Sequence, residues 1–234
     1  CAFEKLDKQL VIVTPTLLQA TQTYEELSEW YDDEVVHLFP VEESLAADFS
    51  VVSPDVVSQR IRTLDFLSRG EKGIVIVPLS GIQKLLVPAA VWKKSSIELA
   101  MGSEIESMDA FVEQLVELGY RRENMVATPG EFALRGSIVD IYPLDQEYPL
   151  RLDFFDTEVD SIRAFNAETQ RSMDVINEVR ILPATDLPLQ KEAVWKAQAK
   201  IHALYEKDVK AAQSPERKDQ VKNIQQAIDA QLEN

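Results

Sequence analysis

The sequence is poor in the residues that build disulfides, metal sites and membrane spans. It has a single cysteine, Cys1, and only two histidines, so we expect neither an internal disulfide nor a cysteine–histidine metal site. No apolar run approaches the roughly 18 residues of a membrane-spanning helix, and the N-terminus has no signal-peptide pattern. These shortages predict a cytoplasmic protein in a reducing compartment, with no metal and no membrane partner.

Positive charge is also scarce. Lysine and arginine together number 24, against 40 aspartate and glutamate residues, which gives a formal net charge of -16. Sequence-independent binding to DNA or RNA is driven by basic patches that neutralise phosphates. The chain by itself is therefore a poor candidate for tight nucleic-acid binding. Acidity that serves only solubility is the simpler alternative.

Glycine is rare as well, and no phosphate-binding loop is present. The chain has 7 glycines, none of which follows the first apolar run at 9–14, where Thr14-Pro15-Thr16 stands instead. A nucleotide site needs a glycine-rich loop between a strand and a helix, so that backbone N–H groups can approach the phosphates. The glycines at 70 and 73 precede a strand and are typical of an exposed loop. We therefore expect no nucleotide or other cofactor in this chain.

Other catalytic patterns are incomplete. His37 and His202 fall in a predicted strand and a predicted helix without partners at ligand spacing, which favours structural roles. Ser80-Gly81 lacks the preceding glycine of a nucleophile elbow. Four acids could mimic a metal or acid–base cluster, but alternating acids on strands are typical of a solvated face: Asp153, Asp156, Glu158 and Asp160. We expect no catalytic residue, and an autonomous enzyme remains the alternative.

The first region, residues 1–98, alternates strand and helix patterns. Apolar β-branched runs at 9–14, 35–39 and 73–78 have the continuous character of strands that are buried on both faces. Helical spacing lies between them, and Ser53-Pro54 is a typical helix start with a capping serine and a proline in the first turn. This order predicts a parallel α/β domain with helical crossovers.

The second region, residues 99–183, changes to one helix followed by antiparallel strands. Ser107 can cap a helix that Gly119 ends, and strands are expected at 132–142, 150–155 and 159–165. In the first of these, Phe132 and Leu134 would share one face and Val139 and Ile141 the other, with a bulge or bend at 135–137. The pattern predicts a small α+β domain.

The third region, residues 184–234, is predicted to be helical. Apolar residues recur at helical spacing from Val194 to Val209, and Ser214-Pro215 repeats the cap-plus-proline signal before a second helix. We therefore expect two C-terminal helices, and a monomeric chain.

What remains is a candidate binding surface in the second region. Arg121 and Arg122 follow the predicted helix, and Arg135 lies at the predicted strand bend. Phe132 and Tyr142 belong to the same predicted strand run. Arginine and aromatic side chains supply the planar, pre-organised contact area that dominates binding interfaces. In the simpler alternative, the aromatics are core residues and the arginines pair with the nearby Glu123 and Glu131.

Three sequence motifs decide between these readings. They are Gly119-YRRENMVATPGEFALRGSIVDIYP, Leu150-RLDFF and Ile162-RAFNAETQRS. Together they resemble the N-terminal, UvrB-like region of the bacterial transcription-repair coupling factor family (Mfd). The resemblance implies a UvrB-like module in three parts. The first part would be a truncated parallel α/β domain that lacks its phosphate-loop start. The second would be a small antiparallel α+β domain inserted in the first, and the third a helical segment.

The resemblance implies that the α+β domain docks UvrA, the damage-sensing ATPase of excision repair. By motif, Arg122 or its neighbour Arg121 takes the first arginine position of that surface and Arg135 the last. Ala133 stands where a middle arginine is expected. Phe132 and Tyr142 fall on the family's aromatic positions near the surface.

The resemblance also implies a longer parent protein. That parent would be an ATP-dependent DNA translocase that contacts RNA polymerase and DNA through other regions, with ATP and magnesium bound only there. A C-terminal domain of such proteins is thought to cover the docking surface. UvrB itself is the alternative, although the segment 40–53 has no tyrosine, whereas UvrB has a tyrosine-rich hairpin that enters damaged DNA.

Overall fold

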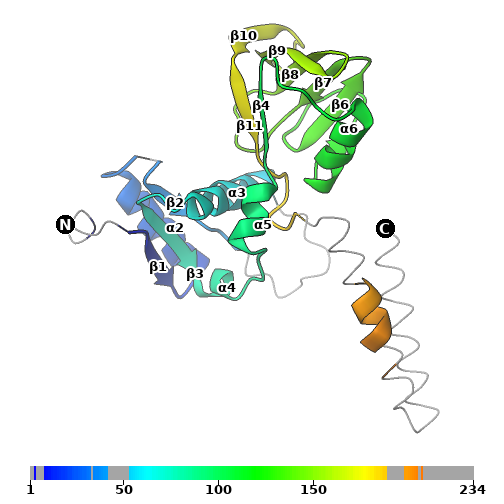
Figure 1. The fold of residues 1–234 in the computed structure, drawn as a ribbon. Coiled ribbons are helices and arrows are strands. Elements are labelled where there is room, and N and C mark those ends of the chain that lie inside the picture. The colour runs from blue at the N-terminus through cyan, green and yellow to red at the C-terminus, as the bar shows by residue number, and fades with distance from the viewer. Residues whose placement is uncertain are drawn as a thin grey trace. The chain divides into compact units, whose positions relative to one another are not determined.

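The chain forms two compact units, Cys1–Pro188 and Leu189–Asn234. The computed structural model describes residues 3, 8–32, 34–41, 53–188, 198–204 and 207. In the second unit, residues 198–204 are helical and lie within the first predicted C-terminal helix (Figure 1). The rest of that helix, apart from residue 207, and the predicted helix after Ser214-Pro215 lie outside the described residues.

A three-stranded parallel sheet occupies the N-terminal part of the first unit. Its strands are β1 (Leu10–Thr14), β2 (Val36–Leu38) and β3 (Ile74–Pro78), in the order β1-β3-β2. The connections run through α2 (Leu17–Ser28) and α3 (Pro54–Arg69). This is the βαβαβ order that the sequence pattern predicted.

Local chemistry favours the start of α2 and both ends of α3, although the predicted cap Ser53 makes no side-chain capping hydrogen bond. The hydroxyl of Thr16 accepts a hydrogen bond from the Gln19 N–H and so caps α2. Helix α3 has Pro54 in its first turn, and it ends at Gly70, whose φ of 73° is the left-handed conformation that glycine adopts without strain.

The prediction that the first strand is buried on both faces was wrong. Leu10 and Ile12 pack in the cluster formed with Ala20 of α2. Val11 and Val13, on the other face, remain 50% and 48% exposed. The reason is position: β1 is an edge strand, whereas the central strand β3 is buried along its whole length.

A two-stranded antiparallel ribbon carries the chain into and out of the second sheet. After the short helices α4 (Leu79–Ile82) and α5 (Ala89–Lys94), strand β4 (Ile97–Ala100) pairs with β11 (Glu178–Ile181). Because the two strands are about eighty positions apart in the sequence, everything between them is an insertion. Neither strand was predicted from the sequence.

The inserted segment forms a six-stranded sheet in the order β10-β9-β8-β7-β6-β5, visible beside α6 (Met108–Glu117) in Figure 1. All neighbouring strands are antiparallel except β5 and β6. The strands are β5 (Arg121–Arg122), β6 (Glu131–Arg135), β7 (Ile138–Ile141), β8 (Leu150–Phe155), β9 (Glu158–Phe165) and β10 (Ser172–Ile176).

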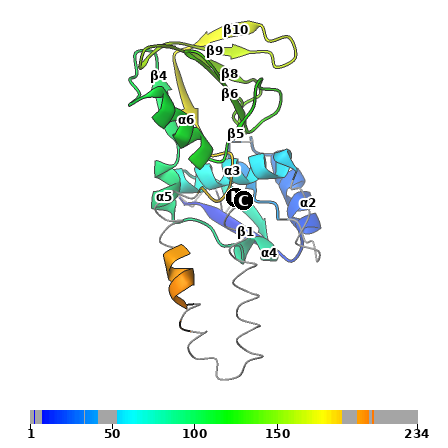
Figure 2. The same ribbon diagram turned by 90° about the vertical axis from the view of Figure 1, so that its right-hand side faces the viewer.

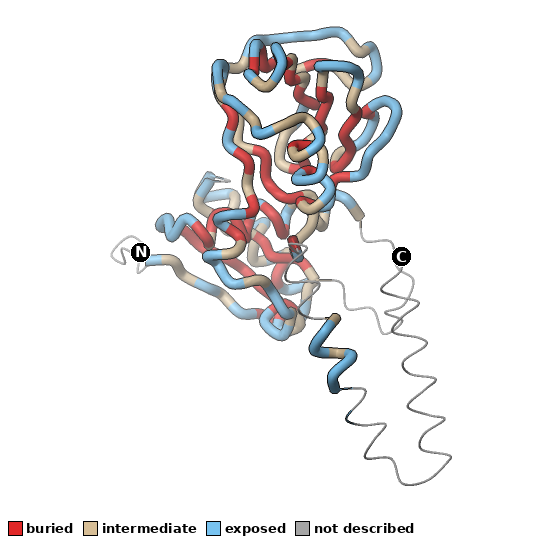
Figure 3. The backbone as a smooth tube through the Cα atoms, turned by 45° about the vertical axis from the view of Figure 1, so that its right-hand side comes forward, coloured by how far each residue is buried: buried red, intermediate tan, exposed pale blue. Residues whose placement is uncertain are grey.

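Helix α6 covers one face of this sheet. The hydroxyl of Ser107 caps the helix by accepting from the Ala110 N–H at 3.1 Å, as the sequence predicted. Phe111 and Leu115 of α6 then pack against Phe132 and Leu152 of the sheet in one continuous core. Figures 2 and 3 show the helix beside the strands and the buried residues concentrated along them.

The expected strand from 132 to 142 is instead a tight hairpin. Strands β6 and β7 are joined at Gly136-Ser137, where Gly136 has a φ of 65°. Phe132 lies opposite Ile141 and Leu134 opposite Val139. Residues paired across a hairpin share a face, so these four side chains all point to the core. The prediction of a single bent strand with opposite faces was therefore wrong.

Candidate docking face

The face of the six-stranded sheet opposite α6, called here the outer face, is the candidate functional surface. Because side chains alternate along each strand, the residues between the core positions lie on this face. The strand register aligns Ala133, Asp140, Arg151 and Arg163 in one row across β6, β7, β8 and β9. Three of these four positions carry charge.

The structure separates the three arginines that the sequence singled out. Arg121 pairs in register with Glu131. Glu131 alternates along β6 with the core residues, as Ala133 and Arg135 do, so Arg121 shares the outer face with Arg135. Their side chains are 69% and 46% exposed. Arg122 pairs in register with the core residue Phe132 and so lies on the opposite side of the edge strand β5. Only Arg121 and Arg135 are brought onto one surface.

The two predicted aromatic residues differ in accessibility. Phe132 is completely buried in the core under α6, so it supports the sheet and cannot contact a partner in this conformation. Tyr142 is half-buried, and its hydroxyl donates to the Glu147 carbonyl at 2.8 Å. Burial, with Glu147 second, raises the pKa of Tyr142.

Ala133 lies beneath a small apolar cluster on the outer face. Val126, Phe165 and the ring of Tyr142 pack against it, and Ala133 is only 1% exposed. Val126 belongs to the loop that precedes β6. The position where the resemblance implies a middle arginine is therefore covered by apolar side chains.

Glu131 anchors the same loop. Its carboxylate accepts hydrogen bonds from the Ala127 and Thr128 N–H groups, both at 2.9 Å, and from the Thr128 hydroxyl at 2.7 Å. Arg121 adds an ion pair at 3.6 Å. Burial by itself would raise the pKa of Glu131, but these hydrogen bonds and Arg121 outweigh it and lower the pKa. The predicted pairing of Glu131 with an arginine is confirmed, whereas the ion pairs of the described residues do not include Glu123.

A buried carboxylate that the sequence analysis missed organises the centre of the outer face. Asp140 is 1% exposed and accepts two hydrogen bonds from Arg151, Nε to Oδ1 at 2.7 Å and Nη2 to Oδ2 at 2.9 Å. Arg135 also donates from Nη2 to Oδ2 of Asp140. These bonds raise the pKa of Arg151, with the Asp140 side chain as the largest cause. One carboxylate thus holds two guanidinium groups.

Known proteins resemble this chain in the same region. Residues 97–187 match the family model of the UvrB interaction domain. The transcription-repair-coupling factor of Staphylococcus epidermidis is 45% identical over 199 residues, which is 85% of this chain and 17% of the relative. The factor of Staphylococcus haemolyticus is 43% identical over 202 residues (86% and 17%). That of Staphylococcus aureus is 41% identical over 204 residues (87% and 17%).

The chain is related to the N-terminal, UvrB-like region of transcription-repair-coupling factors. This confirms the resemblance that the sequence motifs indicated. The chain spans about 17% of the length of the curated relatives it matches. The matched segment runs from the start of β4 to just beyond β11, so it contains the ribbon and the whole six-stranded sheet.

The part related to the UvrB interaction domain also has an unusual set of cations. Between residues 97 and 187 the sequence contains seven arginines and no lysine. This preference for arginine can be read from the sequence. It indicates binding that depends on the orientation of the donors as well as on charge, since a guanidinium is rigid and planar and an ammonium is not. The pairing of Asp140 with particular arginines was not available, because it depends on the hairpin register.

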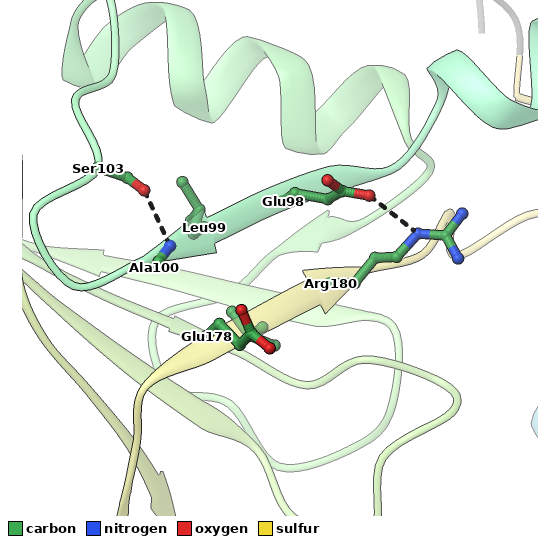
Figure 4. Close-up of a pocket in the computed structure, with 7 residues that line it drawn as sticks. Glu98, Leu99, Ala100, Ser103, Glu178 and Arg180 are labelled. Carbon is green, nitrogen blue, oxygen red and sulfur yellow. Dashed lines mark hydrogen bonds and ion pairs between the residues drawn. The ribbon is translucent and has the colours of Figure 1, made fainter.

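A cavity lies on the ribbon formed by β4 and β11. The cavity, of about 590 Å³, is lined by both ribbon strands, and Figure 4 shows Glu98 facing Arg180 and Ser103 facing Ala100 there. Arg180 is 3.6 Å from Glu98, and the Ser103 hydroxyl accepts from the Ala100 N–H at 2.9 Å. Glu178 also lines the cavity and is outside the ion pairs found among the described residues.

The described part of the chain contains no cluster of three or more His, Cys, Asp and Glu side chains placed to hold a metal ion. None of its helices is both long enough and apolar enough to cross a bilayer.

Proposed function

We propose that this chain is a non-catalytic docking module that binds UvrA and so recruits it to RNA polymerase stalled at a DNA lesion. The process served would be transcription-coupled nucleotide excision repair. The observation that carries the proposal is the match of residues 97–187 to the UvrB interaction domain, on a sheet whose outer face exposes Arg121 and Arg135. The relatives' name, transcription-repair-coupling factor, points to the same process.

The chemistry of the outer face suits a partner that presents carboxylates. Arginine forms bidentate hydrogen bonds with carboxylates, and its planar group loses little freedom on binding. Arg135 and Arg121 would supply these contacts, with Tyr142 at the side and Phe132 as buried support. Arg122 lies on the other side of β5, so we assign the first arginine position to Arg121 instead.

The first prediction concerns Arg135. Arg135→Ala should weaken binding of purified UvrA by about 2 kcal/mol, or roughly thirtyfold in Kd, because a desolvated charge would lose its partner. Titration calorimetry of UvrA against the 234-residue chain measures this. Arg121→Ala should weaken binding in the same direction, and Arg122→Ala should have little effect.

Arg69→Ala is the matched control for this titration. Arg69 lies on α3, outside the matched domain, and its side chain is 44% exposed beside the buried Asp65 at 3.1 Å. Arg135 has nearly the same exposure beside the buried Asp140. Equal binding by folded Arg135→Ala and Arg69→Ala variants would contradict the site, and absence of binding by the wild-type chain would contradict the function.

Other activities belong to the parent protein in this proposal. Contacts with RNA polymerase and DNA, and ATP- and magnesium-dependent translocation, would come from regions outside this chain. A cytoplasmic location and a monomeric state are part of the same proposal. The alternative, a fragment of UvrB, is not favoured, because the relatives found at 40% identity and above are named transcription-repair-coupling factors.

A further inference from the structure

We propose that Asp140 is a positioning residue of the docking face. It holds the guanidinium groups of Arg135 and Arg151 in one fixed orientation on the outer face, where they meet carboxylates of an acidic partner surface. The inference rests on the proposed function and adds to it the group that orients the contact residues. It also adds Arg151, which lies outside the surface that the resemblance implies.

The first support is that Asp140 is buried without being part of the apolar core. It lies on β7 between Ala133 of β6 and Arg151 of β8, on the outer face. Burying a carboxylate is costly unless it is paired and hydrogen-bonded. Both of its oxygens accept from arginine, and each of the two arginines comes from a neighbouring strand. The pairing thus links β6 and β8 across β7.

The second support is that Arg151 is held from several directions. Besides its two bonds to Asp140, its guanidinium lies 4.5 Å above the centre of the Phe165 ring. Its Nη1 is 3.5 Å from the Gln170 carbonyl, and the Gln170 side chain donates to the Val126 carbonyl at 3.3 Å. A cation fixed in this way loses little rotamer entropy when a partner binds, which is how pre-organisation increases affinity.

The third support is the balance of charge. Two guanidinium groups share one carboxylate, so the network keeps a net positive charge. Arg163 adds another cation beside Arg151 in the same row, exposed and outside the ion pairs found among the described residues. Asp153 is a second carboxylate on the same face, so three arginines stand against two carboxylates around this network. In a chain with a net charge of -16, this part of the outer face is therefore locally positive and complementary to an acidic partner.

A substitution that removes the Asp140 carboxylate distinguishes two explanations of binding, orientation of the arginines and attraction by charge alone. Asp140→Asn makes the outer face more positive. If the face acted by charge alone, an acidic partner would associate faster and bind more tightly. If Asp140 orients the arginines, the partner dissociates faster despite the added positive charge. The two explanations predict opposite changes in affinity.

The experiment measures association and dissociation of purified UvrA on the immobilised 234-residue chain by surface plasmon resonance. We expect Asp140→Asn to raise the dissociation rate about tenfold with no decrease in the association rate. Asp153→Asn is the matched control. Asp153 is also on the outer face of β8, opposite Ile138, and the same change in charge there leaves the arginine network intact. It should leave the dissociation rate unchanged.

A second variant keeps the test valid if Asp140→Asn does not fold, as judged by thermal unfolding. Arg151→Lys retains the positive charge but cannot form the two parallel bonds to Asp140. It should also raise the dissociation rate. In an Arg135→Ala background the effect of Asp140→Asn should be smaller than in the wild-type chain, because one of the two arginines through which Asp140 acts has been removed. A purely structural role would instead give additive effects.

The outcomes also distinguish this inference from the proposed function. Wild-type dissociation rates in folded Asp140→Asn and Arg151→Lys, with binding reduced in Arg135→Ala, would overturn the positioning role and leave the docking function standing. Tighter binding by Asp140→Asn would overturn it in favour of simple attraction. Failure of the wild-type chain to bind UvrA would overturn both.

Discussion

At the scale of single residues, the arginines of the docking face have two tasks. A guanidinium carries five N–H donors in a plane, so one edge can bind Asp140 while another faces outward. Arg135 illustrates this, because it donates to Asp140 and its side chain is still 46% exposed. Lysine could not do the same, since its donors radiate from one point. All the lysine and arginine positions of the matched domain are arginines, and two of them use this geometry on Asp140.

Glu131 provides a prediction at this scale that depends on pH. Its pKa in the folded chain lies below the ordinary value of 4.5. A lowered pKa means that the carboxylate stabilises the fold above its unfolded-state pKa and that this contribution is lost as the pH falls through the folded-state value. Glu131→Gln should therefore lower the free energy of unfolding at pH 7.

The measurement is urea unfolding of wild type and Glu131→Gln at pH 7 and at about pH 3, below the ordinary pKa of a glutamate. The difference between the two proteins should shrink at the lower pH, because the unfolded chain then takes up a proton at this carboxylate more readily than the folded chain does. A difference that stays constant with pH would show that the lost bonds to Ala127 and Thr128 matter but the charge does not.

At the scale of elements, the hairpin between β6 and β7 sets the whole outer face. Its two-residue turn places Ala133 opposite Asp140, and the next pairing places Asp140 opposite Arg151. A shift of one residue would turn every side chain of the strand to the other face. The buried network therefore depends on the turn being tight and in register.

Gly136 provides the test of this dependence. Its φ of 65° is unfavourable for residues with a Cβ, although a Cβ there would meet nothing within 4 Å. Gly136→Ala should therefore lower the free energy of unfolding by about 1 kcal/mol through backbone strain alone. Gly136→Asn should cost less, because asparagine tolerates this conformation better. Urea unfolding measures both, and an equal loss in the two variants would point to a cause other than backbone strain.

At the scale of the whole molecule, charge is distributed unevenly. The chain has a net charge of -16, yet six of its eleven arginines lie between residues 121 and 171. Four of these six lie on the outer face: Arg121, Arg135, Arg151 and Arg163. The negative field of the whole chain repels polyanions. The local arrangement of arginines suits carboxylates that can each pair with one guanidinium group.

This distribution predicts that the chain alone does not bind DNA tightly. In a gel-shift assay at about 0.15 M salt, a short duplex with or without a lesion should remain unshifted, because the negative field opposes phosphate binding. The same chain should still bind UvrA. A shifted, damage-dependent complex would contradict the prediction and revive the reading of the chain as part of UvrB.

The sequence by itself determined much of the local structure. Alternation of apolar runs and helical spacing predicted the parallel order of β1, β2 and β3, because that order follows from local patterns and connection length. The capping serine Ser107 predicted the start of α6, and Pro54 predicted the start of α3. The motifs around Arg135 indicated the family through their resemblance to it. Composition excluded a glycine-rich phosphate loop and an internal disulfide.

The tertiary structure decided which residues meet. The exposed Val11 and Val13 of β1 look like core in the sequence, and the two strands of the ribbon are too far apart in the chain for local patterns to join them. In the sequence, Asp140 is indistinguishable from the other acidic residues on predicted strands. It becomes a buried partner of two arginines only because the hairpin register, fixed by packing of the opposite face against α6, aligns residues from three strands. Local propensity acts over a few residues, whereas the docking face depends on long-range pairing.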